Sequence, residues 1–505
     1  MIATAIPVVG SLNSKAYPKA VLDTNQPCTQ SGWFQLQKLF ASDGTVADCF
    51  GSSVSLSGDT ALIGARGCDN YKGSTYVFTH TGTTWTQQAK LTASDGAAGD
   101  CFGWSVSLSD DSALIGAYGY SGEKGAAYVF TRSGTSWTQQ AKLLASDGDA
   151  SDCFGVSVSL SGDTALIGSH GHDVGKGAAY VFIRTGTTWT QQAELQSSDG
   201  TAGDLFGYSV SLSGDTALIG AHQFSGTKGA VYVFTRTGST WTQQAEIFNP
   251  GNENNYFGVA VSLSGNTALI GTNAYESSGS AYVFARSGTS WSQQAKLVAS
   301  DGAPGDFFGF FVSLSDDIAL IGAPSDFSHN GSAYVFTRSG TSWTQQAKLV
   351  ASDGTADDFF GHRVSISGDT ALIGAYQGDN YKGSAYVFMK DTVPPTVSIT
   401  DPKGVFFNGN KIIPFKINLA IILKCNTIFI KANAVDSLSG IAKVDFYIST
   451  WKGAPVNVGT ATTSPYQWLW NKGAVPGHHI FKVYAQAFDV AGNNAVSNKV
   501  LVIWI

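Results

Sequence analysis

Aspartate pairs recur in short glycine-containing segments, with a spacing that could hold calcium. Carboxylate oxygens and the carbonyls of a glycine loop are ligands that calcium prefers. Aspartates in such segments also form ordinary turns, because their side chains hydrogen-bond to nearby backbone groups. We favour turn formation and keep calcium as the alternative, with Asp43, Asp48, Asp95 and Asp100 as weak candidates. The pairs are Asp43/Asp48, Asp95/Asp100, Asp147/Asp152, Asp199/Asp204, Asp301/Asp306 and Asp353/Asp358.

Two histidines, His170 and His222, occupy the same position of an internal repeat, and His172 lies close to the first. Converging loops could bring such imidazoles together as metal ligands. The repeat position of His170 and His222 holds unrelated residues in the other copies. This favours an interpretation of the two histidines as ordinary polar loop residues rather than as ligands of a shared metal ion. The other copies place there Arg66, Tyr118, Asn273, Pro324 and Tyr376.

Three cysteines, Cys49, Cys101 and Cys153, share another position that accepts large apolar residues in the other copies. We therefore expect small buried hydrophobic side chains at this position, with Cys101 and Cys153 as free thiols. If a hairpin turns at Gly58-Asp59, Cys49 lies opposite Cys68, and a disulfide between them is possible in an exported chain. No Cys-x-x-Cys spacing predicts structural zinc. The other copies place in this position Leu205, Tyr256, Phe307 and Phe359.

Nothing in the sequence predicts catalysis. A nucleophile triad, a phosphate-binding loop or an HExxH motif would be unique to one copy of the repeat. What stands out instead is repetition, and repeated residues are usually structural. We therefore predict a protein that is not an enzyme.

Seven variable segments carry the uncommon polar and aromatic residues. They lie between the second and third strands expected in each repeat, beginning at Arg66, Tyr118, His170, His222, Asn273, Pro324 and Tyr376. A rigid scaffold with variable loops is how recognition surfaces are built, although drift in unconstrained loops is the alternative. We expect these loops to share one rim. The candidate ligand-binding residues are Tyr71, Tyr118, His170, His222, Asn273 and Tyr381.

The elements that position these loops come from a segment of about 52 residues that is written seven times. Its Phe-Gly marker begins at Phe50, Phe102, Phe154, Phe206, Phe257, Phe308 and Phe360. Repeats of this length predict arrays of small β units that bury their apolar faces against one another. Each copy shows four strand patterns, with Gly-Asp or a related pair between the first two. Seven such units predict a β-propeller.

The repeat begins and ends out of phase. WFQLQKL (Trp33 to Leu39) is an outer strand without a blade, and the last copy ends at Phe388 without an outer strand. We predict that Trp33–Leu39 pairs with Tyr386–Phe388, which closes the ring and removes an open edge.

The pattern Phe-Gly, S-V-S-L-S-G-D, A-L-I-G-A and A-Y-V-F resembles the FG-GAP repeat of integrin α-chain heads and their prokaryotic relatives. This resemblance covers Trp33 to Phe388 and implies an exported propeller that works by adhesion or recognition. Many FG-GAP blades carry a calcium-binding DxDxDG loop between the first two strands. In this chain that place holds only SGDT (Ser57 to Thr60) or a related sequence, so the family's calcium sites are not carried over.

Beyond Phe388 the repeat stops, and Pro394-Pro395 marks a stiff linker. The β patterns that follow suit a β-sandwich. DTVPPTVSIT, AKVDFYI and AFDVAGN resemble immunoglobulin-like modules of bacterial and archaeal surface proteins. The expected domains are a leader (1–30), the propeller (31–390), a linker (391–398) and an immunoglobulin-like sandwich (399–505).

Composition narrows the classes of partner. Charged residues make up 13% of the 505 residues and the net charge is -7, which disfavours nucleic acid. No stretch has the roughly 18 to 20 apolar residues of a membrane-spanning helix. Residues 1–30 resemble a truncated signal peptide, with a disordered leader as the alternative.

We therefore expect a secreted or cell-surface recognition or adhesion protein that binds a protein or a glycan through its propeller loops. Two alternatives stay open. One is a carbohydrate-active enzyme or lectin with a pocket near the propeller axis, and the other is a purely structural surface-layer or spacer component.

Overall fold

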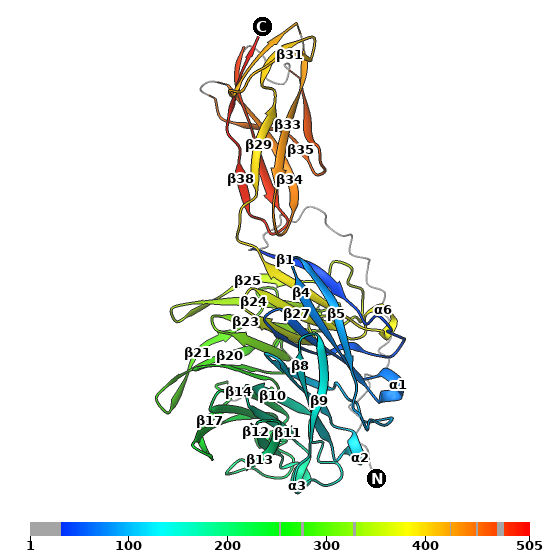
Figure 1. Ribbon diagram of the computed structural model, residues 1–505. Helices are drawn as coiled ribbons and strands as arrows, with labels where there is room; N and C mark the ends of the chain where they lie inside the picture. The colour runs from blue at the N-terminus through cyan, green and yellow to red at the C-terminus, as the bar shows by residue number, and fades with distance from the viewer. Residues whose placement is uncertain are drawn as a thin grey trace, which may run out of the picture.

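The computed structural model describes residues 32–251, 254–273, 277–326, 330–424, 426–450, 453–471 and 479–505. The predicted leader therefore lies outside the described residues. Within them, seven four-stranded antiparallel sheets form the blades of a propeller, followed by a β-sandwich (Figure 1). The predicted all-β architecture is confirmed.

The blades are built from consecutive strands that run from the inner to the outer edge of each sheet. The first three are β2(Phe50–Ser57), β3(Thr60–Ala65), β4(Ser74–Thr81), β5(Thr84–Leu91); β6(Ser105–Ser109), β7(Ser112–Ala117), β8(Ala126–Ser133), β9(Ser136–Leu143); and β10(Ser157–Ser161), β11(Thr164–Ser169), β12(Ala178–Thr185), β13(Thr188–Leu195). The next three are β14(Ser209–Ser213), β15(Thr216–Ala221), β16(Ala230–Thr237), β17(Thr240–Phe248); β18(Val261–Ser264), β19(Thr267–Gly271), β20(Ala281–Ser287), β21(Ser290–Leu297); and β22(Phe311–Ser315), β23(Ile318–Ala323), β24(Ser332–Ser339), β25(Ser342–Leu349). The seventh comprises β26(Arg363–Ser367), β27(Thr370–Ala375), β28(Ser384–Lys390) and β1(Trp33–Leu39).

The burial of each strand follows its place in the blade. The second strand is packed on both faces, and in the first blade all six residues of TALIGA are buried. This explains its continuous run of apolar residues. The outer strand β5 alternates between exposed and buried positions at its start, as expected for a half-exposed strand. The predicted turn at Gly58-Asp59 is confirmed, because Ser57 pairs with Thr60.

The Phe-Gly marker joins neighbouring blades. The Phe102 ring contacts Tyr128 edge-on at 5.5 Å inside its own blade, while its backbone N–H donates to the Lys72 carbonyl of the preceding blade at 3.0 Å. Gly73 follows that lysine with φ +87°, and a Cβ there would lie 2.0 Å from the Phe102 carbonyl oxygen. Only glycine fits so close an approach.

The ring closes as predicted. β1 pairs antiparallel with β28, with Gln35 opposite Phe388 and Lys38 opposite Tyr386. In Figure 1 the blue β1 lies beside the yellow strands of the last blade. The chain therefore supplies the outer strand of its last blade from residues that precede its first blade.

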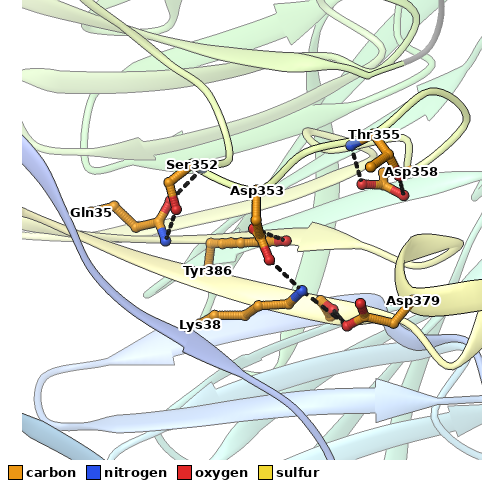
Figure 2. A network of polar contacts seen from close by, with 9 residues as sticks. Gln35, Lys38, Ser352, Asp353, Thr355, Asp358, Asp379 and Tyr386 are labelled. Carbon is orange, nitrogen blue, oxygen red and sulfur yellow. Dashed lines mark hydrogen bonds and ion pairs between the residues drawn. The ribbon is translucent and has the colours of Figure 1, made fainter.

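A polar network fastens the closing strand (Figure 2). Lys38 Nζ lies 2.8 Å from Asp353 and 2.9 Å from Asp379, and the Tyr386 hydroxyl donates to Asp353 at 2.9 Å. Gln35 donates to the Ser352 hydroxyl at 3.0 Å and accepts from the Ser352 backbone N–H at 2.9 Å. Burial disfavours the charged ammonium, but the two carboxylates outweigh it and raise the pKa of Lys38.

The C-terminal unit is a sandwich of two sheets. Its apolar core contains Trp470 and Trp504, whose rings meet edge-to-face at 4.7 Å. One sheet comprises β29(Thr396–Asp401), β33(Thr427–Val435) and β36(Tyr466–Asn471). The other comprises β30(Gly404–Phe407), β31(Asn410–Pro414), β32(Leu419–Leu423), β34(Ile441–Thr450), β35(Val456–Ala461), β37(Ile480–Asp489), β38(Asn494–Val496) and β39(Val500–Trp504).

Candidate recognition face

Where they are described, the variable loops lie at one rim of the propeller. Short helical turns form where five of them are described, and Figure 1 shows α6, α1, α2 and α3 along one side of the ring. The loops also form backbone hydrogen bonds with the next blade. The Cys101 N–H donates to the Tyr71 carbonyl at 2.7 Å, and the Cys49 N–H donates to the Tyr381 carbonyl at 3.3 Å. The turns are α1(Cys68–Tyr71), α2(Tyr120–Glu123), α3(His172–Gly175), α4(Phe224–Thr227) and α6(Gly378–Tyr381).

Five of the six predicted ligand-binding residues divide into two groups on this rim. Tyr71 and Tyr381 are exposed, at 51% and 54% of their surface, on the outer part of the loops. Tyr118, His170 and His222 are partly or fully buried and join a cluster toward the axis. Asn273 is half-buried, and its side-chain oxygen has no hydrogen-bond partner.

We call the inner group the axial cluster. It comprises Arg66, Trp104, Tyr118, His170, Tyr208, His222, Tyr256, Phe310, Phe311, His362, Arg363 and Tyr376. The Tyr208 and His222 rings lie 4.1 Å apart, and the His362 and Tyr376 rings 4.4 Å apart. Tyr208 belongs to the fourth blade, yet it lies close enough to Arg363 of the seventh blade to act on the pKa of that arginine, in the upward direction. Residues of such distant blades approach each other only near the propeller axis.

Two arginines of the axial cluster stack on aromatic rings. The Arg66 guanidinium lies 4.4 Å from the Trp104 ring centroid, and the Arg363 guanidinium lies 3.6 Å from that of Phe311. Among the described residues, no carboxylate forms an ion pair with either. Burial lowers the pKa of Arg363 to about 9, with Arg66 acting in the same direction. A guanidinium stacked by its face keeps its edge N–H groups available for an anion.

The histidines of the axial cluster are neutral at pH 7. Burial lowers the pKa of His170 to about 4, and burial together with His170 lowers the pKa of His222 to about 3. Burial and the two arginines hold the pKa of His362 well below its usual range. The Nδ1 atoms of all three are buried and have no hydrogen-bond partner. These imidazoles therefore offer buried polar atoms to a ligand.

Sequence reasoning missed Trp104, Tyr208, Phe311, His362 and Arg363. A signal was available in the third residue after the marker phenylalanine. Four blades place a serine there, and Ser53 donates from this position to the Gly103 carbonyl of the next blade at 2.7 Å. Phe311 and Arg363 break that pattern. A large side chain at a position that is serine in most blades indicates a residue that extends toward the propeller axis.

The opposite rim is structurally repetitive. A cavity of about 510 Å³ lies there between the first two blades, beside the Gly58-Asp59 turn. Its Arg132 donates to Asp111 at 2.6 Å and to the Thr60 hydroxyl at 3.0 Å. Arg184 and Arg236 repeat this pairing with Asp163 and Asp215. These cations already have partners, in contrast to the arginines of the axial cluster.

The calcium candidates have protein partners. The Asp43 carboxylate accepts from the Tyr76 hydroxyl at 2.8 Å and from Lys90 at 2.6 Å. Asp48 accepts from the Thr45 backbone N–H at 2.7 Å. Asp95 and Asp100 repeat these two arrangements with Tyr128, Lys142 and the Ala97 N–H. Lysine and tyrosine side chains therefore satisfy Asp43 and Asp95, and turn N–H groups satisfy Asp48 and Asp100.

The disulfide considered possible between Cys49 and Cys68 is not formed, because both are free thiols. A bulge separates Phe50, opposite Ala65, from Ser53, opposite Gly64, and this shifts the register before the hairpin. Cys68 instead lies in α1, 3.9 Å from the Tyr76 hydroxyl. Cys101 and Cys153 are buried free thiols, as predicted.

A second group of carboxylates lies where the propeller meets the sandwich. Oxygen atoms of Asp391, Asp436 and Asp489 lie within 4.8 Å of one another and could hold a hard cation. Loop N–H groups already satisfy them; for example, the Asn493 N–H donates to Asp489 at 2.8 Å. Burial and the neighbouring carboxylates raise the pKa of Asp489.

These features define the class: a seven-bladed propeller closed by its own first strand and joined to an immunoglobulin-like sandwich. The chain belongs to the FG-GAP repeat family, whose repeat matches residues 33–78, 85–130, 137–182, 189–234, 241–284, 291–336 and 343–388. Residues 395–483 match the bacterial Ig domain. Both resemblances expected from the sequence are thus confirmed, and the architecture fits a surface or recognition protein.

Solved structures show distant likeness. AofleA from Arthrobotrys oligospora has 12% identity and a TM-score of 0.40, over 63% of this chain and 90% of its own. A Trypanosoma rangeli sialidase mutant has 10% identity and a TM-score of 0.34, over 92% of this chain and 86% of its own. Scores this low carry no information about function. No curated protein sequence matches significantly, and among the described residues no helix is long and apolar enough to cross a membrane.

Proposed function

We propose that this protein is a secreted or cell-surface recognition protein without catalytic activity, and that it binds its ligand at the loop rim of the propeller. The axial cluster is the centre of the proposed site. The observation that carries the proposal is the pair Arg66 and Arg363, stacked on aromatic rings without a carboxylate partner among the described residues. A structural spacer has no need for two unneutralised cations close together.

The chemistry of the cluster favours an acidic glycan. Aromatic faces bind the apolar faces of sugar rings, and guanidinium edges bind carboxylate or sulfate groups in bidentate fashion. The exposed Tyr71 and Tyr381 extend the contact surface onto the outer loops. A protein ligand would use the same anchors through its own acidic side chains.

The lectin alternative agrees with this site, whereas the enzyme alternative lacks support. A glycoside hydrolase needs two carboxylates that flank the scissile bond. The inner strands place mainly serine and valine at the loop rim, as Ser105 and Val106 show, and no described aspartate or glutamate joins the axial cluster.

Two substitutions that restore the repeat's own residues test the proposal. Arg363→Ser introduces the residue that four other blades hold, and Asp110→Gly restores the turn residue of most blades on the opposite rim. The full chain is screened on an array of acidic and neutral glycans and of proteins, and hits are titrated by calorimetry.

We expect Arg363→Ser to weaken binding by about 10- to 100-fold, the effect of losing a charged hydrogen bond. Asp110→Gly should leave binding unchanged. Equal losses for both variants, or a loss only for Asp110→Gly, would place the ligand elsewhere. Binding of neutral and acidic ligands with equal affinity would reject the role of the arginines.

A further inference from the structure

A polar group recurs at the loop rim of most blades, on the outer side. In the second blade, the Tyr128 hydroxyl donates to Asp95 at 3.0 Å, and Lys142 of the outer strand lies 2.6 Å from the other oxygen of the same carboxylate. The lysine thereby neutralises the aspartate. The same group occurs as Asp43/Tyr76/Lys90, Asp301/Tyr334/Lys348 and Asp353/Tyr386/Lys38.

The third blade inverts the charge of this group. Glu194 occupies the lysine position, directly opposite Tyr180 in the strand ladder. His172 of α3 occupies the position that Tyr120 holds in the second blade. One ligand atom from each of Asp147, His172 and Glu194 lies within 4.8 Å of the other two. Two carboxylates and an imidazole thus converge where the other blades place an ammonium group.

The imidazole is oriented as a metal ligand would be. His172 Nδ1 lies 3.0 Å from an oxygen of the buried Asp152, and Nε2 lies 3.7 Å from Glu194. An Nδ1–H that donates to Asp152 leaves the lone pair of Nε2 facing Glu194. Metal-binding histidines almost always have such a carboxylate or carbonyl partner on the nitrogen that does not bind the metal.

An unpartnered hydroxyl provides an independent observation. Tyr180 is completely buried, and its hydroxyl lies near Asp147 without forming a hydrogen bond of standard geometry. Its equivalents, such as Tyr128, donate to the aspartate of their own blade. Tyr180 lies beside Glu194 in the ladder and contacts His172 edge-on at 6.2 Å. A buried hydroxyl without a partner, at this position, indicates a missing component of the group.

We propose that Asp147, His172 and Glu194 bind a divalent transition-metal ion of the zinc type. One imidazole and two carboxylates suit zinc, whereas calcium and magnesium prefer oxygen ligands alone. Asp147 and Glu194 are exposed, so the ion has access from solvent. Three protein ligands leave a coordination position open to water or to an acidic group of a ligand. This site is separate from the axial cluster and does not depend on the proposed function.

The neighbouring blades offer matched controls. The fourth blade also has a glutamate, Glu246, but its Tyr232 hydroxyl donates to Asp199 at 2.9 Å, and Phe224 replaces the histidine. Glu246→Lys should therefore not change metal binding. Glu194→Lys introduces the residue that five other blades hold, so it should preserve the fold and remove the site. His172→Tyr, which copies the second blade, is a second disruptive variant.

The test is a titration of the full chain with Zn²⁺ by calorimetry after treatment with a chelator, with the absorption of bound Co²⁺ as a second readout. We expect one site per wild-type chain that is at least tenfold weaker in Glu194→Lys and His172→Tyr and unchanged in Glu246→Lys. Absence of this site in the wild type would overturn the proposal. So would equal affinity in all four proteins, or a loss caused by Glu246→Lys. Circular dichroism of the metal-free variants establishes that each is folded.

Discussion

Closure of the ring by β1 leads to a quantitative prediction about Leu39. This side chain is 1% exposed, and Leu143, its equivalent in the continuous second blade, is 3% exposed. Truncating a buried leucine to alanine costs about 2–5 kcal/mol. Leu143 belongs to an outer strand that a tight turn joins to its neighbour, whereas Leu39 lies in β1, which pairs with β28 without such a turn. If the ring is closed in solution, Leu39→Ala and Leu143→Ala should cost similar free energies of unfolding.

The assay is thermal unfolding of both variants and of a chain lacking residues 1–40. A loss of about 3 kcal/mol should lower the melting temperature by roughly 4 °C, because the unfolding entropy is about 2.1 cal/mol/K per residue and the propeller has about 360 residues. The deletion should also lower it, because β28 then becomes an exposed edge. The reasoning is refuted if Leu39→Ala and the deletion melt like the wild type while Leu143→Ala is destabilised. That result would mean that β1 does not contribute to the folded propeller.

Three further predictions concern pH, thiols and glycine. Because burial lowers the pKa of His222 to about 3, the unfolded chain binds a proton below about pH 6.5 that the folded chain does not. Stability should therefore fall between pH 6.5 and 3, and His222→Tyr should reduce the difference in melting temperature between pH 7 and pH 4.5. Cys101→Leu and Cys153→Leu should each cost less than about 1.5 kcal/mol, and thiol titration in denaturant without reductant should lose one thiol per substitution. Gly73→Ala should lower the free energy of unfolding by more than about 3 kcal/mol, because the added Cβ clashes with the next blade. Gly82→Ala has a similar φ but open surroundings and should cost about 1 kcal/mol. Chemical denaturation measures both costs, and equal costs would contradict this account.

Periodicity made the fold readable from the sequence. Seven Phe-Gly markers and the unpaired strand patterns at Trp33 and Phe388 predicted the blade count and the closure, because a closed ring of blades leaves no unpaired edge. The free thiols of Cys101 and Cys153 were also predictable, since other blades place leucine or phenylalanine in the same slot. The possible disulfide between Cys49 and Cys68 is not formed, because counting residues outward from the turn cannot reveal the bulge between Phe50 and Ser53.

The candidate sites depended on the tertiary structure. The sequence supplied the variable loops, including His170 and His222, and the substitution of glutamate for lysine at Glu194. The sequence could not show that Arg66 and Arg363, nearly 300 residues apart, lie close together at the axis. Nor could it show that no carboxylate among the described residues forms an ion pair with either arginine. It also could not show that Asp152 orients His172 toward Glu194. Local patterns determine which strands form and how often they repeat, whereas contacts between blades arise only when the ring closes and sets their angles and distances.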